Sequence, residues 1–131
     1  MNGPAMCPDQ VVELLDRAFN DGDLESVLAF YEEDACVITP PGTTLRGPAQ
    51  LRPFFERALA SGTHATQLRT RVFEADGIAL FLSHWTLTRK TAEPDTQPQV
   101  FVATTVFRRQ PDRSWKILID NPFGPAVLAA G

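Results

Sequence analysis

Asp120 is the residue whose position offers chemistry most directly. It follows the apolar run of residues 117–119 and, by the alternation of a strand, shares a face with Lys116 and Leu118. A carboxylate among apolar neighbours has a raised pKa and can act as a base near neutral pH. The alternative is a structural carboxylate that accepts backbone N–H groups or pairs with an arginine at the end of the sheet.

The histidines, cysteines and serines do not assemble a recognisable catalytic or metal site. Ser83 and His84 are adjacent on an expected strand, so their side chains point to opposite faces and the imidazole cannot activate that hydroxyl. His64 is interpreted as a solvated residue at a strand start. Cys7 and Cys36 are unclustered and are expected to be free thiols. No metal and no cofactor are therefore expected, and the chain has neither a phosphate-binding loop nor a dinucleotide fingerprint.

Two helices joined by a tight turn are expected to position these groups. Apolar residues recur at helical spacing over residues 9–20, and Asp16 falls on the opposite, polar face. Asp23 is placed to cap a second helix that reaches Tyr31, and the acidic residues 32–34 end it. Tyr31 is expected either to border a cavity or to anchor helix against sheet.

A small hairpin and a third helix follow. Residues 35–39 and 43–45 are prone to form strands and flank a turn at Pro41-Gly42. Pro48 opens the third helix, where its missing N–H costs nothing, and Pro53 predicts a break or kink inside that helix.

Beyond Gly62 the period switches from helical to two, which predicts four strands in antiparallel order. These segments are residues 64–74, 77–89, 99–109 and 114–121, with a long polar loop over residues 90–98. The fold class is α+β: three N-terminal helices packed on a curved, mostly antiparallel sheet of four long strands plus the small hairpin. One domain is expected over residues 9–124, between tails at 1–8 and 125–131.

Both faces of residues 77–89 are apolar, which is unexpected for a sheet covered by helices on one side. Phe81, Ser83 and Trp85 alternate with a second apolar set in which His84 also lies. The outer face therefore needs a cover, and a second copy of the chain is the simplest one. A homodimer is predicted, with His84 as a hydrogen-bonded residue of its interface.

Composition excludes two classes of partner. The 131 residues carry 16 acidic and 12 basic side chains, a net charge of -4 that disfavours nucleic acid. No apolar run approaches the roughly 20 residues that cross a bilayer, so no membrane partner is expected. The first ten residues lack the basic and apolar regions of a secretory signal, which predicts a cytoplasmic location.

The order helix, Gly22-Asp23 turn, helix, Tyr31-x-x-Asp34-Ala35, strand, Pro41-Gly42 turn and Arg46-Gly47-Pro48 carries a resemblance. This run resembles the start of SnoaL-like proteins of the nuclear-transport-factor-2-like superfamily, also called cystatin-like or ketosteroid-isomerase-like. The ending, residues 113–124, is similar to the last strand of the same group. The resemblance implies a cone-shaped α+β barrel with a pocket between the helices and the concave face of the sheet, and a dimer through the convex face.

The resemblance also implies which chemistry is missing. The base of ketosteroid isomerase falls on Thr39, its oxyanion-hole tyrosine on Leu15, and the acidic partner of that tyrosine on or near Thr105. None of these residues carries the required group, so ketosteroid isomerase activity is not expected. The same register directs Asp120 toward the pocket, as in some SnoaL-like polyketide cyclases that use a pocket aspartate.

Three functions remain open. The first is a homodimer that binds a small hydrophobic or amphipathic molecule; the second is an acid–base enzyme of cyclase, isomerase or hydrolase type that uses Asp120; the third is an accessory module that binds another protein by its sheet face. Aromatic side chains either line the pocket or fill it. The expected pocket residues are Leu15, Phe19, Tyr31, Thr39, Phe55, Phe81, Ser83, Trp85, Phe101 and Thr105.

Overall fold

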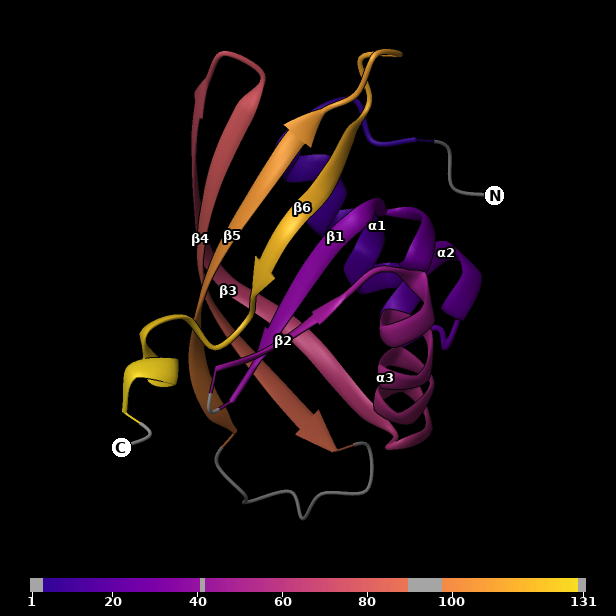
Figure 1. Cartoon of the computed structure of the whole chain (residues 1–131). Coiled ribbons are helices and arrows are strands. Elements are labelled where there is room, and N and C mark those ends of the chain that lie inside the picture. Colours follow the sequence, from indigo (N-terminus) through magenta and orange to yellow (C-terminus); the bar gives the residue numbers. More distant parts are fainter. Residues whose placement is uncertain (1–3, 41, 90–97, 130–131) are drawn as a thin grey trace.

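Three helices pack against one face of a six-stranded sheet in the computed structural model (Figure 1). The structure describes residues 4–40, 42–89 and 98–129. The expected α+β architecture is confirmed. The elements are α1 (Pro8–Asn20), α2 (Leu24–Ala29), β1 (Tyr31–Thr39), β2 (Thr43–Arg46), α3 (Pro48–Ala60), β3 (Thr63–Ala75), β4 (Ile78–Arg89), β5 (Gln99–Arg109), β6 (Trp115–Asn121) and the short 3-10 helix η1 (Gly124–Leu128).

The sheet is mixed and open. Its strand order is β2-β1-β6-β5-β4-β3, so the last strand inserts between the N-terminal hairpin and the meander. All pairs are antiparallel except β1 and β6, in which Tyr31 lies opposite Ile117 and Val37 opposite Asp120. Because β2 and β3 are the two edges of the described sheet, the cone is a curved open sheet and not a closed barrel.

The helix pair forms as expected, but the second helix is shorter. Asp23 caps α2 by accepting a hydrogen bond from the Ser26 N–H at 3.2 Å, and Gly22 takes the positive φ of 72° that the turn requires. The prediction that the helix reaches Tyr31 and ends at residues 32–34 was wrong, because Tyr31 already begins β1. Pairing with β6 satisfies that backbone in the extended form, and tertiary pairing overrides the local helical pattern.

The third helix contains Pro53 without a break. α3 is one continuous helix from Pro48 to Ala60, so the predicted interruption is absent. Pro53 removes the donor for the carbonyl of Ala49, and both residues are exposed, so the missing hydrogen bond leaves no buried polar group. The inward face of the helix still carries Leu51 and Phe55, which are 2% and 7% exposed.

The antiparallel strands β3, β4 and β5 follow the expected ranges within a residue or two. The loop expected over residues 90–98 lies outside the described residues up to residue 97. Along β4 the alternation is as predicted: Phe81, Ser83 and Trp85 are buried on the inner face, whereas Leu80 and His84 are exposed on the outer face.

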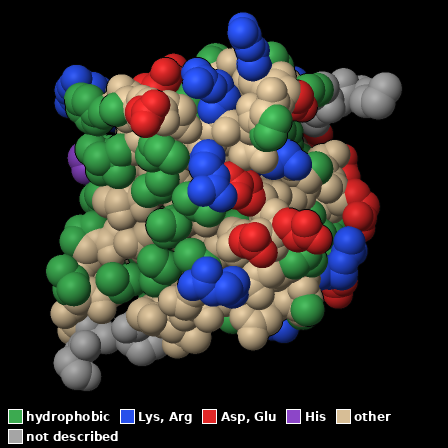
Figure 2. Space-filling model, turned by 45° about the horizontal axis from the view of Figure 1, so that its top comes forward, with side chains coloured by type: hydrophobic (Ala, Val, Ile, Leu, Met, Phe, Trp, Pro, Cys, Tyr) green, Lys and Arg blue, Asp and Glu red, His purple; other side chains and the backbone are tan. Residues whose placement is uncertain are grey.

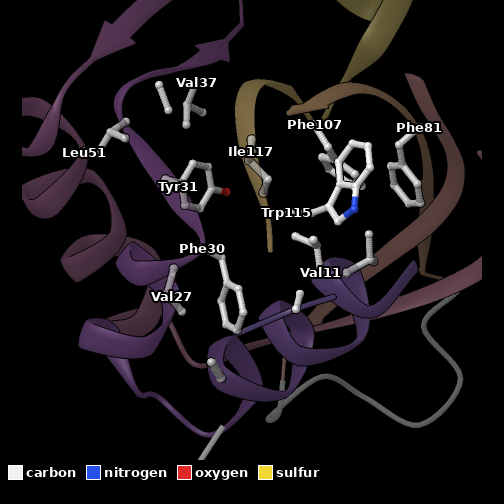
Figure 3. Packing of buried hydrophobic residues seen from close by; sticks show 14 of the residues in the cluster. Val11, Val27, Phe30, Tyr31, Val37, Leu51, Phe81, Phe107, Trp115 and Ile117 are labelled. Carbon is white, nitrogen blue, oxygen red and sulfur yellow. The ribbon is translucent and has the colours of Figure 1, made fainter. Parts of the chain in front are cut away.

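The buried side chains form one core between the helices and the inner face of the sheet (Figure 3). Tyr31 lies within it, with Leu51 of α3 on one side and Ile117 of β6 on the other. The segment before α1, which the sequence suggests as a tail, also joins this core. Ala5 is 1% exposed and its carbonyl accepts the N–H of Trp115 at 2.8 Å. No helix of the described part is long and apolar enough to cross a membrane.

The outer face of the sheet carries an apolar row that crosses four strands. Register places Phe73, Leu80, Val106 and Ile119 side by side on β3, β4, β5 and β6. Phe73, Leu80 and Ile119 are 50%, 42% and 36% exposed. Figure 2 shows hydrophobic side chains gathered on one side of the molecule. The two-faced apolar character expected of the sheet is therefore present.

The chain after β6 folds back against β5 at Gly124. A Cβ at this position would overlap the carbonyl oxygen of Val102, and the φ of 48° also favours glycine. The preceding carbonyl of Pro122 accepts the indole N–H of Trp85 at 2.7 Å, and the ring of Phe123 packs on Trp85 and Phe101. These contacts hold Pro122 and Phe123 in the wall of a cavity.

Candidate functional site

A cavity of about 190 Å³ lies between the helices and the inner face of the sheet. Its walls come from α1, α3, all of the long strands and the turn after β6. Most of the lining side chains are aliphatic or aromatic, and the described lining contains no Lys, Arg or His. The expected residues that line it are Leu15, Phe19, Tyr31, Phe55, Phe81, Trp85, Thr105 and Asp120.

Three other expected pocket residues lie elsewhere. Thr39 donates to the Thr43 carbonyl at 3.3 Å within the β1–β2 hairpin. Ser83 is buried and donates to the side-chain oxygen of Gln67. Phe101 stands behind Trp85, with ring centroids 5.1 Å apart. The latter two support lining residues, whereas Thr39 is separate from the cavity.

Asp120 faces the cavity and is held by two hydroxyl groups. The Tyr31 hydroxyl donates to its Oδ2 at 2.6 Å and the Thr105 hydroxyl to its Oδ1 at 3.2 Å. Burial raises the pKa of the Asp120 carboxyl, and these two hydrogen bonds oppose that shift. Burial also raises the pKa of Tyr31 well above its usual value, so the phenol remains a donor.

The inner face of β6 differs from the face predicted by simple alternation. A bulge between Ile117 and Ile119 adds one residue to β6 opposite β5. Asp120 therefore shares the inner face with Ile117, and not with Lys116 and Leu118 as expected. The predicted direction of Asp120 toward the pocket is present, but its neighbours on that face are different.

Asp16 is a second carboxyl group in the cavity wall, and the sequence pattern placed it on the polar face of α1. Burial raises its pKa to about 6; the Gln67 amide opposes the shift and the nearby Asp120 charge adds to it. The signal that could have found it is its spacing, four residues after Val12 and three before Phe19, both of which line the cavity. The side of α1 that faces the sheet is therefore wider than its apolar residues alone suggest.

The position of Asp16 is fixed by contacts on both sides. One turn later, the Asn20 side chain exchanges two hydrogen bonds with the backbone of Ala65, at 2.9 and 3.1 Å, and so joins the end of α1 to β3. Opposite Asp16, the oxygen of the Gln67 amide is occupied by the Ser83 hydroxyl. The Gln67 NH₂ group is thereby directed away from Ser83 and is available to a carboxylate.

Asp16 and Gln67 separate the cavity from an outer groove between α1 and β3. Val12 and Phe81 also line both hollows, and the groove additionally has Asp9 and Arg71 in its wall. A single layer of side chains therefore divides the cavity from solvent at this point. The groove brings solvent up to Asp16, the carboxyl group that borders both hollows.

Other candidate groups lie apart from the cavity. His84 is exposed on the outer face and His64 is exposed at the start of β3. Cys7 and Cys36 are free, and the described residues contain no group of three or more side chains that could hold a metal ion. The arrangement around the cavity can hold a small molecule against two carboxyl groups, and it can accept or donate a proton there.

We expect Asp16→Asn to stabilise the fold at pH 7. Below about pH 4 the carboxyl is protonated in both states; between about pH 4 and pH 6 only the folded state holds the proton, so stability is lost as pH rises. The variant has no carboxyl group to titrate, so its free energy of unfolding at pH 7 should be about 2 kcal/mol higher than that of the wild type. A full pKa shift of two units corresponds to roughly 3 kcal/mol, and the expected value is smaller because solvent reaches part of the side chain.

Urea unfolding of both proteins at pH 4 and pH 7 measures this difference. Asp21→Asn is the control, because Asp21 is exposed just after the same helix. A variant less stable than the wild type at pH 7 would contradict the assignment of a desolvated carboxyl.

Comparisons with known proteins agree on the fold. A family model described as SnoaL-like domain matches residues 11–117. A comparison with curated proteins gives no match.

Solved structures similar to the chain include proteins from three bacteria. A protein of the NTF2-like family from Streptomyces avermitilis has 18% identity and a TM-score of 0.74, covering 86% of this chain and 89% of that one. A protein of unknown function with a cystatin-like fold from Nostoc punctiforme has 16% identity and a TM-score of 0.73, with 87% and 85% covered. An NTF2-like protein from Pseudomonas putida has 18% identity and a TM-score of 0.74, with 86% and 80% covered. At these identities the likeness concerns the fold. Since the family model spans most of the chain, the protein belongs to the SnoaL-like domain family.

Proposed function

We propose that the protein is a homodimer that binds a small, hydrophobic or amphipathic molecule in the cavity between its helices and its sheet. The observation that carries the proposal is the cavity of about 190 Å³ with two carboxyl groups in a mostly apolar wall. The aromatic side chains line this space without filling it. A dry cavity of roughly 150 Å³ holds benzene, so the ligand has about the size of one ring with a short chain.

The location of the polar groups supports a ligand with one polar end. Asp16, Gln67 and Asp120 lie in the wall toward α1 and β6, whereas Phe54 and Ala58 of α3 and Leu87 of β4 give an apolar wall. A ligand with a polar head and an apolar body can satisfy both walls at once. A reducing, cytoplasmic location is part of the proposal and suits the free thiols of Cys7 and Cys36.

We expect Ala58→Leu to abolish binding, because the added carbons enter the cavity from α3. Titration of 2-phenylethanol, followed by NMR shifts of the cavity residues, is the measurement. Ala60→Leu is the matched control, with the same substitution at an exposed position of the same helix. Binding that survives Ala58→Leu, or shifts confined to residues outside the cavity, would show that the ligand lies elsewhere.

A second candidate function is acid–base catalysis, and the pair Asp16 and Asp120 favours it. Burial raises the pKa of both carboxyls, that of Asp16 to about 6, which is close to the pH at which a cytoplasmic enzyme would use a base. Asp120 would accept a proton from a bound substrate, and the Tyr31 hydroxyl at 2.6 Å would stabilise the carboxylate before that step. Thr39, Leu15 and Thr105 still lack the groups of a ketosteroid isomerase.

If Asp120 is a base, the protein should speed deuterium exchange at the activated CH₂ of phenylacetone in D₂O. Asp120→Asn should reduce the exchange rate by about 100-fold or more, the usual contribution of a positioned base. Proton NMR measures the exchange, and Asp21→Asn is the control. Wild-type exchange no faster than in buffer, or a variant as fast as the wild type, would remove this candidate.

The dimer would use the apolar row of Phe73, Leu80, Val106 and Ile119 on the outer face. This row runs across four strands without a charged side chain in register between its members, and water would otherwise cover it. A second copy of the same face is self-complementary in a two-fold dimer. The third possibility, a different protein as cover, is an outcome of the same test.

We expect the wild-type protein to sediment as a dimer and Leu80→Lys as a monomer, because a lysine at the centre of the row would be buried without a partner. Ala60→Lys, which adds the same charge on the helical side, should leave the dimer intact. A wild-type monomer at micromolar concentration would contradict the homodimer and favour a different covering protein.

A further inference from the structure

The charge of the cavity wall is of one sign. Asp16 and Asp120 are the ionisable acids in it, and no Lys, Arg or His lies among the described lining residues. Two arginines on elements of the cavity wall have partners outside it: Arg17 of α1 pairs with Glu13 at 3.4 Å, and Arg71 of β3 lies over the ring of Phe73. Among the described residues, no basic side chain therefore pairs with either carboxylate. A positive charge that pairs with these carboxylates must therefore belong to the ligand.

The carboxyl groups are held in place but not saturated. Asp120 accepts one hydrogen bond on each oxygen, from Tyr31 and Thr105. A carboxylate has about four acceptor sites, so further donors can bind to it. All of the side-chain partners around the pair are neutral hydroxyl or amide groups. They fix geometry without neutralising charge.

The remaining wall suits a cation with an apolar body. The side chains of Phe19, Phe55 and Trp85 border the same cavity. Aromatic faces attract ammonium groups as well as hydrocarbon, and the attraction grows when water is excluded. An anionic ligand would instead meet two like charges and no compensating donor with a positive charge.

The outer groove offers a route whose wall is mainly acidic, with Arg71 as its one basic side chain among the described residues. Asp9, Glu13 and Asp16 follow one another along α1 and all border the groove. Asp16 is the one member that also borders the cavity. A cation that enters between α1 and β3 would therefore move along acidic side chains toward the inner site.

We propose that the ligand is a small primary or secondary amine with an apolar body of about one ring, whose ammonium group pairs with Asp16 and Asp120 inside the cavity. This inference rests on the proposed binding function and adds the chemical class of the ligand. The ammonium group would provide both the charge and two or three N–H donors that the cavity wall lacks. The ring would lie against Phe55 and Trp85, toward α3.

Three probes of nearly equal shape test the class. They are 2-phenylethylamine, the neutral 2-phenylethanol and the anionic phenylacetate, each titrated at pH 7.5 by calorimetry and by NMR shifts of cavity residues. The amine should bind at least tenfold more tightly than the alcohol, and phenylacetate should not bind. Tenfold corresponds to one charge-assisted hydrogen bond in place of a neutral one.

Two variants test whether the carboxyl groups of the cavity cause the preference for the amine over the alcohol. Asp16→Asn should lower the affinity for the amine at least tenfold and the affinity for 2-phenylethanol by a clearly smaller factor, since the alcohol carries no charge that pairs with the carboxylate. Asp120→Asn should act in the same direction, which keeps the test independent of the folding of one variant. Asp21→Asn should change neither affinity.

The possible results distinguish a wrong ligand class from a wrong binding function. An alcohol that binds as tightly as the amine, an equal loss of both ligands in Asp16→Asn, or tight binding of phenylacetate would overturn the amine and leave the binding function in place. If none of the three probes changes the NMR signal of any cavity residue, both the amine class and the binding function would be overturned.

Discussion

The hydrogen bond from the Tyr31 hydroxyl to Asp120 is the contact on which the cavity depends. It joins the first strand to the last, across 89 residues of sequence, and it lies in the interior. Both groups would be costly there if unpaired, because a buried polar group without a partner loses its hydration and gains nothing in return. Together they hold β1 and β6 in parallel register and direct one carboxyl group inward. The ring centroid of Phe55 lies 5.2 Å from that of Tyr31, so the same tyrosine also packs against α3.

The fold concentrates polar groups in one wall of an apolar space, and this arrangement has an energetic cost. Asp16 and Asp120 both have raised pKa values because burial disfavours their charged forms. A chain under selection for stability alone would place an apolar side chain at position 16, which packs between Val12 and Phe19. Keeping a carboxyl there is typical of a site that binds or reacts, since such sites retain groups that destabilise the fold.

Most of the architecture could be predicted from the sequence because it rests on local patterns. The Gly22-Asp23 turn, the period-two strands and the inner and outer faces of β4 follow from residue spacing alone. The features that local sequence patterns did not predict depend on the three-dimensional surroundings of the residues. Tyr31 belongs to a strand because β6 lies beside it, and Pro53 stays within a helix because the carbonyl of Ala49, which it leaves without a donor, is on the exposed side of α3.

The candidate site was predictable only in part, for a related reason. Eight of the eleven expected site residues line the cavity, since inward faces of strands and helices converge there. Asp120 points inward through a bulge that alternation does not anticipate. Asp16 was assigned to the polar face because its side chain is acidic, and composition alone cannot tell an acid in solvent from an acid in a cavity wall.

The parallel pair of β1 and β6 also sets the order in which the molecule can be completed. During synthesis β1 leaves the ribosome before β3, β4 and β5, but β6, the strand that separates β1 from the meander, is made after all of them. Until residues 115–124 emerge, Tyr31 has no partner, β1 has an open edge, and the future cavity is an uncovered hydrophobic concavity. Contacts of such long sequence separation slow folding, so the nascent chain passes through a state with an exposed apolar surface. Closing this cavity therefore requires the β6 segment to join β1 and β5, after every other strand of the described sheet has been made.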